Sequence, residues 1–437
     1  MIISIPKKLT PLVAVNFAKA ISECESAEEY IYDFGDMQHC HPFGLLVIAS
    51  AIRRNMERLN EARHSVINTE VTQGGQFAAS FGFYQSIGFN IGLAKDEDEE
   101  GDRYIPIKKI SAQDLHSEYL DTLMLNEKVN RHAATLSQML IGNQPTVVQD
   151  ALQYCFREIM RNTFEHANID SLWVCGQYWP ARKEAEIAVL DEGIGVFRSL
   201  HANSRISVSS CKEANKLALQ PGLSRTLGMK QDPFDVWQNS GYGLYVASTL
   251  CAMNGGYFVL SSGDSAILVN SQNQIEYSGA QQGTAVCLNI RVNSKKLKQF
   301  DQTLSAIVNE GERKARENGE KRILTASKVT TIASMIRHIE NEITDEAEKT
   351  WNDESIIPIN TEVVFEARSC NARGEISGGF SYNGKEYRGL LLNVDSFNRK
   401  KFVEEKMKVR VVVRKLSNNI YKLLESHKYK KTLERFR

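Results

Sequence analysis

The sequence predicts a mixed α/β protein built from several domains. A chain of 437 residues is longer than one hydrophobic core ordinarily organises, so we expect two to four domains. Short apolar strands alternate with amphipathic helices near the N-terminus and again through the middle, whereas the pattern is almost entirely β after residue 356. These changes of pattern predict four segments, at residues 1–112, 113–293, 294–352 and 353–437.

The first segment alternates strands with helices. Strands are expected at IISI, EYIYDFG and SVINTEV, and helices at LVAVNFAKAISE, FGLLVIASAIRRNMERLN and QFAASFGFYQSIGF. The run DFGDMQHCHPFGLLVIASAIR and the later GFYQSIGF resemble a STAS domain, the fold of anti-sigma-factor antagonists. Phosphorylatable STAS domains offer Ser or Thr before the helix, but here that loop contains His41 followed by Pro42. The resemblance therefore implies a protein-contact or scaffold role without the phosphorylated hydroxyl.

The stretch VVQDALQYCFREIMRNTFEHA, residues 147–167, predicts a buried helix with polar residues along one face. Glu158, Asn162 and His166 are four residues apart and therefore stack on one face of a helix. A carboxylate and a carboxamide one turn apart need a partner if buried, because an unpaired buried charge is costly. A metal–phosphate site would supply that partner. The apolar residues of the other faces are Val148, Ala151, Leu152, Cys155, Phe156 and Ile159.

Two glycine-rich segments follow this helix. The run EIAVLDEGIGV predicts an apolar strand that leads into Asp191 and then Gly193 and Gly195. In NSGYGLYVASTLCAMNGG, Gly241 and Gly243 directly precede an apolar helical run. A glycine-rich turn that opens a helix directs free backbone N–H groups at an anion, and the helix dipole favours negative charge there.

A final motif, QQGTAVCLNI, places Gly283 and Thr284 before an alternating strand. In this order the four segments resemble the Bergerat-fold (GHKL) ATPases: gyrase B, MutL and the sensor histidine kinases, with the anti-sigma-factor kinases as cousins. The resemblance covers about residues 120–293 and implies an α+β sandwich that binds ATP and Mg²⁺.

The resemblance implies a role for each motif residue. Asn162 would hold the magnesium ion that bridges the phosphates, and Glu158 has the position of the general base in gyrase-like and MutL-like relatives. Asp191 would accept a hydrogen bond from the adenine amino group. The other implied nucleotide contacts are Gly193 and Gly195 near the base, Gly241 and Gly243 in the phosphate loop, Thr284 near the adenine, and His166.

The 45 residues between the two glycine pairs, 196–240, are longer than ordinary loops, which indicates a functional lid or further helices. SCKEANKLALQ predicts a helix there. By the resemblance this segment is the ATP lid. Lys216, Arg225 and Lys230 are candidates for phosphate contacts, and the alternative is that they are solvated lid charges.

Three functional classes are compatible with these motifs: an ATPase acting as a conformational switch, a serine or histidine protein kinase, and a non-hydrolysing nucleotide sensor. A long helix expected over 113–146 contains His132, the one candidate phospho-acceptor of a sensor kinase. His132 lacks the acidic neighbour and downstream proline of the usual box, and only 29 residues separate it from Asn162. We therefore expect a slow, nucleotide-driven ATPase switch in a bacterial regulatory or defence system.

The C-terminal part is expected to contain a helical connector over 294–352 and then a small β domain. Asn383-Gly384 between alternating residues predicts a hairpin, and four or five short strands favour a small barrel of the OB-like kind. Residues 397–437 contain fourteen Lys or Arg against four Glu. Nucleic-acid binding and a solvated basic tail on an interaction module are the two alternatives for this region.

The composition of the whole chain limits which partners and which cellular compartment are expected. Lys plus Arg equals Asp plus Glu at 53 each, so the total charge predicts no polyanionic partner. The eight cysteines are scattered without a C-x-x-C pair, which is typical of buried thiols in a reducing compartment, and the adjacent His39, Cys40 and His41 cannot easily converge on one metal ion. With neither a signal peptide nor a membrane-span-length apolar run, we expect a cytoplasmic protein that forms a homodimer or binds a protein partner through the STAS-like segment.

Overall fold

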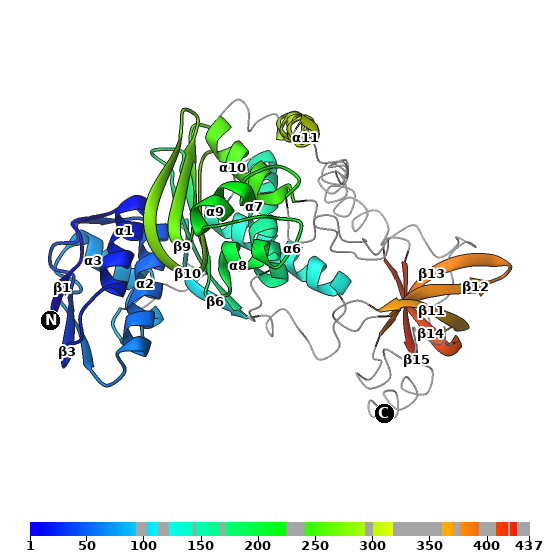
Figure 1. Cartoon of the computed structure of the whole chain (residues 1–437), viewed down its shortest axis with the longest axis horizontal. Coiled ribbons are helices and arrows are strands. Elements are labelled where there is room, and N and C mark those ends of the chain that lie inside the picture. Colours follow the sequence, from blue (N-terminus) through cyan, green and yellow to red (C-terminus); the bar gives the residue numbers. More distant parts are fainter. Residues whose placement is uncertain are drawn as a thin grey trace. The chain divides into compact units, whose positions relative to one another are not determined.

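Three layers of secondary structure, with a five-stranded antiparallel sheet in the middle, form the larger part of the chain in the computed structural model (Figure 1). The chain divides into two compact units, and the sheet belongs to the first. The structure describes residues 1–92, 103–111, 122–142, 146–166, 171–223, 241–292, 300–317, 361–370, 376–392, 408–417 and 420–425.

The central sheet has the strand order β6-β7-β8-β10-β9. Every neighbouring pair in it is antiparallel. Its edge strand β6 precedes residue 112, so the sheet takes one strand from the first of the four expected segments. The strands are β6 (Tyr104–Ser111), β7 (Ser171–Trp179), β8 (Glu184–Asp191), β9 (Tyr257–Asn270) and β10 (Gln274–Arg291).

One face of the central sheet is covered by α7 (Thr146–His166) and α10 (Gly243–Met253). Both were expected from their apolar periodicity, and the six apolar residues predicted to bury α7 are all buried. Further helices of this unit are α8 (Gly195–His201), α9 (Cys211–Ala218), α11 (Phe300–Glu317) and, from Lys128 onward, α6 (Thr122–Ile141).

The N-terminal module, residues 1–92, contains a parallel sheet of order β1-β3-β5 and a short second sheet of β2 and β4. The first two expected strands and the first two expected helices match the observed ones, whereas the strand expected at SVINTEV covers RHSVI instead and the short second sheet was not expected. The run QFAASFGFYQSIGF forms two helices, separated at Gly82, because that glycine adopts a left-handed φ of 71°. The elements are β1 (Ile2–Ser4), β2 (Lys8–Leu9), α1 (Pro11–Ser22), β3 (Glu29–Asp33), β4 (His39–Cys40), α2 (Pro42–Arg58), β5 (Arg63–Ile67), α3 (Gln73–Ser80) and α4 (Phe83–Ser86).

Helices α1 and α2 of this module pack on the other face of the central sheet. Strand β8 is therefore buried on both faces, which explains its uninterrupted apolar run from Ile187 to Leu190. Side chains alternate along it: Ala188 and Leu190 belong to the core shared with α1 and α2, whereas Val189 and Asp191 face α7 and α10. The N-terminal module and the sheet thus share one hydrophobic core.

A buried carboxylate fixes α2 on the sheet. Glu186 of β8 is completely buried and accepts hydrogen bonds from the Phe43 amide at 3.2 Å, the Tyr257 hydroxyl at 2.8 Å and His41 Nδ1 at 2.8 Å. Burial lowers the pKa of His41, but the hydrogen bond and charge of Glu186 outweigh it, so that pKa is raised. The negative group lies at the N-terminus of α2, where the helix dipole stabilises it.

The second unit contains a closed five-stranded barrel of order β11-β12-β13-β15-β14. The expected barrel is therefore confirmed. Asn383 and Gly384 form the predicted hairpin turn, with left-handed φ angles of 49° and 75°. The strands are β11 (Glu362–Cys370), β12 (Ile376–Tyr382), β13 (Lys385–Leu392), β14 (Lys408–Ser417) and β15 (Ile420–Glu425). Among the described residues, no helix is long and apolar enough to span a bilayer.

Candidate functional site

A cavity of about 100 Å³, partly open to solvent, lies between the central sheet and the helices α7, α8 and α10. Its walls are mostly apolar, with a few polar groups at the ends of elements. The sequence motifs predicted to act together therefore do meet in one place. The lining residues are Ile159, Asn162, Thr163, Val189, Asp191, Gly195, Val196, Ser199, Leu200, Ala218, Leu223, Gly241, Gly243, Leu244, Thr284 and Val286.

Asp191 ends β8 and is the buried acid of this cavity, with only 4% of its surface exposed. The backbone amides of Gly193 and Thr284 donate to its Oδ1 at 3.0 and 3.2 Å. Because an ionised carboxylate has about four lone-pair sites, capacity to accept further hydrogen bonds is left. Burial raises the pKa of Asp191 to about 7, although these hydrogen bonds oppose the shift. The carboxyl can therefore exist in either protonation state near neutrality.

The approach of β10 to Asp191 depends on Gly283. This residue has a left-handed φ of 69°, and a Cβ placed on it would lie 2.2 Å from the Asp191 carbonyl oxygen. Only a residue without a side chain lets the next amide, that of Thr284, reach the carboxylate. Thr284 and Asp191 are direct partners in the pairing of β10 with β8.

A second glycine shapes the turn after Asp191. Gly195, at the start of α8, has a φ of 75°, and the Ser262 hydroxyl is 2.8 Å from where its Cβ would be. That hydroxyl accepts from the Val196 amide at 2.9 Å and donates to the Gly283 carbonyl at 2.7 Å. Ser262 therefore ties the two glycine turns together, a role that the sequence did not indicate because no motif surrounds it.

The N-terminus of α10 forms another wall. Gly241, with a φ of 68°, and Gly243, the first residue of α10, both line the cavity, as the glycine-rich motif predicts. A Cβ on Gly243 would lie 2.6 Å from Glu158 Oε2, so this glycine allows α10 to approach α7 closely. The positive end of an 11-residue helix therefore faces the cavity.

The polar face of α7 divides into two parts. Asn162 is half-buried and lines the cavity, whereas Glu158, 5% exposed, is not among the lining residues. Arg157 donates to Glu158 through Nε at 3.1 Å and Nη2 at 2.5 Å, and Arg161 lies 3.9 Å away. Burial raises the pKa of Glu158, but the two arginines outweigh burial and lower it. Glu158 is therefore an ionised member of a buried charge cluster beside the first turn of α10.

The lid candidates are only partly described. Lys216 lies in α9, where its ammonium group and that of Lys212 both pair with the Glu276 carboxylate of β10, and it is not a lining residue. Arg225 and Lys230 lie outside the described residues, as does the side chain of His166, the last residue of α7. The phosphate contacts of Lys216, Arg225 and Lys230 and the nucleotide contact of His166 thus remain predictions.

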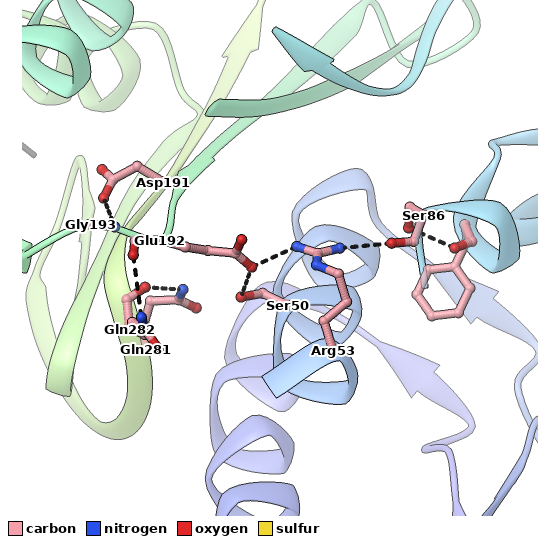
Figure 2. Close-up of polar contacts among 9 residues, drawn as sticks. Ser50, Arg53, Ser86, Asp191, Glu192, Gly193, Gln281 and Gln282 are labelled. Atoms are coloured by element: carbon pink, nitrogen blue, oxygen red, sulfur yellow. Dashed lines mark hydrogen bonds and ion pairs between the residues drawn. The ribbon is translucent and has the colours of Figure 1, made fainter. Parts of the chain in front are cut away.

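Figure 2 shows a polar network behind the Asp191 turn. The side chains of Asp191 and Glu192 point in opposite directions, and Glu192 reaches α2 of the N-terminal module. Ser50 Oγ and Arg53 Nη2 donate to Glu192 Oε1 at 2.9 and 2.8 Å. Sequence patterns could not reveal these contacts, since the partners are about 140 residues apart in the chain.

A groove on the barrel of the second unit bears on the nucleic-acid alternative. Its charged lining residues are Glu362, Glu366 and Glu386 against Arg368. This sign of charge does not complement a phosphate backbone. Most of the basic region at 397–437 lies outside the described residues, so nucleic-acid binding there stays a prediction.

Comparison of the chain with protein-family models, curated proteins and solved structures finds no significant match. The functional assignment therefore rests on the residues of the cavity.

Proposed function

We propose that this chain binds ATP with Mg²⁺ in the cavity between the central sheet and α7, α8 and α10, as a Bergerat-fold ATPase with an N-terminal STAS-like domain. The observation that carries the proposal is Asp191: a buried acceptor, held by two backbone amides, at one end of an apolar cavity. That arrangement suits a flat heterocycle with an exocyclic amino group, because the apolar walls exclude water and the carboxylate fixes the amino group.

The other end of the cavity has features that suit a triphosphate. Gly241 and Gly243 bring the N-terminus of α10 to the cavity wall, where backbone amides and the helix dipole favour anions. The half-buried carboxamide of Asn162 fits a magnesium ion, which proteins usually hold through one or two oxygen ligands together with substrate phosphates and water. Bound there, the ion would neutralise charge on the phosphates.

Glu158 decides between hydrolysis and sensing. As the general base it would orient a water molecule for attack on the terminal phosphate. Glu158, however, forms ion pairs with Arg157 and Arg161 and does not line the cavity. Both observations favour the second candidate, a nucleotide sensor that hydrolyses ATP slowly or not at all. In either case, nucleotide would act by changing the lid, residues 196–240, and the flanking domains.

Titration of the full chain with a fluorescent ATP analogue, with and without Mg²⁺, tests binding. We expect saturable binding that Mg²⁺ strengthens and that unlabelled ATP competes away. Incubation with γ-labelled ATP then separates the classes: released phosphate supports the ATPase, label on His132 or a serine supports a kinase, and binding without either supports the sensor. No binding under any of these conditions would refute the proposal.

A further inference from the structure

The alternation of side chains along β8 continues past its last residue. Asp191 faces the cavity, and Glu192 therefore turns to the opposite face of the sheet, toward α2 (Figure 2). One peptide unit thus joins the acceptor in the cavity to a carboxylate that contacts the N-terminal module. Any force on Glu192 is transmitted directly to the backbone that carries Asp191 and Gly193.

Arg53 is the main group holding Glu192. Its side chain is only 15% exposed, and its Nη2 lies 2.8 Å from Glu192 Oε1. Two other contacts keep the guanidinium in place: Nη1 donates to the Ser86 carbonyl at 3.1 Å, and the group lies 4.2 Å from the ring centre of Trp173 on β7. A charge-assisted hydrogen bond from so constrained a donor is directional as well as strong.

The turn is also held from the sheet. Gln282 of β10 donates a hydrogen bond from Nε2 to the Glu192 carbonyl at 3.3 Å. The backbone amides of Gly193 and Thr284 also donate hydrogen bonds to Asp191. The Asp191–Gly193 segment therefore has two anchors, one on β10 and one on α2. Only the α2 anchor comes from the N-terminal module.

The α2 anchor also sets the electrostatics of the turn. Burial raises the pKa of Glu192, but the charge and hydrogen bonds of Arg53 and the hydrogen bond of Ser50 outweigh it and lower that pKa. The neighbouring Glu192 charge in turn raises the pKa of Asp191. The described charged groups that face the turn are thus Glu192 itself and, on α2, Arg53 and Arg54.

We propose that Arg53 is a positioning residue of the cavity: through Glu192 it holds the Asp191–Gly193 turn in the geometry that accepts an adenine amino group, so the N-terminal module sets nucleotide affinity. This inference rests on the proposed function. It gives the N-terminal module a direct connection to the cavity, because any change in the Arg53–Glu192 contact also changes the turn that carries Asp191. Arg53 should therefore affect recognition of the adenine base and not of the phosphates.

The test compares Arg53→Ala with Arg58→Ala in the full chain. Arg58 is the matched control, since it lies on the same helix but, among the described residues, donates its hydrogen bonds to Asn55 and to the Cys24 carbonyl of the N-terminal module. Titrated with the fluorescent ATP analogue and with adenosine, Arg53→Ala should weaken both about tenfold, whereas Arg58→Ala should change neither. Equal losses in both variants, or none in either, would overturn the inference.

A pH profile separates positioning from a merely structural role. Adenosine affinity should rise with pH as Asp191 loses its proton, with a wild-type midpoint near 7. In Arg53→Ala, loss of the positive charge should move the midpoint to higher pH. In Glu192→Gln, loss of the negative charge should move it to lower pH, and this second variant keeps the test available if Arg53→Ala folds poorly. Midpoints that do not move refute the inference. A wild type that binds neither ligand at any pH refutes the proposed function instead.

Discussion

Replacing Asp191 with Asn should stabilise the protein at alkaline pH while weakening nucleotide binding. The pKa of Asp191 is about 7 in the folded chain, against an ordinary value of 3.8. The unfolded chain therefore releases this proton from about pH 4 upward, whereas the folded chain retains it until about pH 7. Because the folded state binds more protons in this window, stability falls as pH rises through it, and the full loss is present above pH 7.

The size of the effect follows from the shift. A difference of about three pKa units corresponds to roughly 4 kcal/mol at high pH, of which roughly 2.5 kcal/mol falls between pH 5 and pH 8. Asn has nearly the same shape, and its carbonyl oxygen can still accept the Gly193 and Thr284 amides, but it does not ionise. Its amide donors oppose the adenine amino group, so affinity for ATP should fall about tenfold or more.

Urea unfolding of wild type and Asp191→Asn at pH 5 and pH 8 measures the stability difference. Subtracting the free energy of unfolding of one protein from that of the other cancels the contributions of all other titrating groups. Asp264→Asn, at an exposed position in β9, is the matched control. If the two proteins lose equal stability between pH 5 and pH 8, the burial argument is wrong. If nucleotide affinity is unchanged, Asp191 does not recognise the base.

Three further substitutions test the roles assigned to Asn162, Glu158 and Gly283. Asn162→Ala should remove the strengthening of ATP binding by Mg²⁺ but leave adenosine binding intact, and loss of both in titration would place Asn162 at the base instead. Glu158→Gln should still bind MgATP, and if Glu158 is the base, phosphate release should fall by about 10²–10⁴-fold; an unchanged rate would exclude that role. Gly283→Ala should abolish nucleotide binding and lower the melting temperature, because its Cβ would lie 2.2 Å from a backbone oxygen of β8. Gly384→Ala is its control, because Gly384 has a similar positive φ but open space around it. Equal decreases in melting temperature in both variants would mean that backbone strain, and not the close approach to β8, explains the effect.

Local patterns in the sequence predicted much of this structure. The period of apolar residues identified α7, and the Asn383-Gly384 dipeptide identified the hairpin of the barrel. The resemblance to Bergerat-fold ATPases, and not local spacing, predicted that Asn162, Asp191, Gly241 and Thr284 belong to one site, and all four line the cavity. Helix α7 and the hairpin, by contrast, each depend on residues close together in the chain, where spacing determines which side chains share a face.

Long-range pairing was not predictable in the same way. Lys216 was a candidate for a phosphate contact, but its ammonium group pairs with Glu276, sixty residues later in the chain. The run from Ile187 to Leu190 of β8 is apolar on both faces, so its sequence does not disclose that one face meets the N-terminal module. Arg53 and Glu192 each have the sequence context of an ordinary surface charge, and only the fold joins them.

The shared core has a consequence for synthesis of the chain on the ribosome. The N-terminal module emerges first, yet α1 and α2 pack against β7, β8 and β10, and β10 ends at Arg291. About 200 further residues must be translated before that face is covered, which takes roughly 10–40 s at ordinary elongation rates. During this time the nascent chain exposes the apolar surfaces of both helices. A chaperone bound to the emerging module would protect it from aggregation until the last strand arrives.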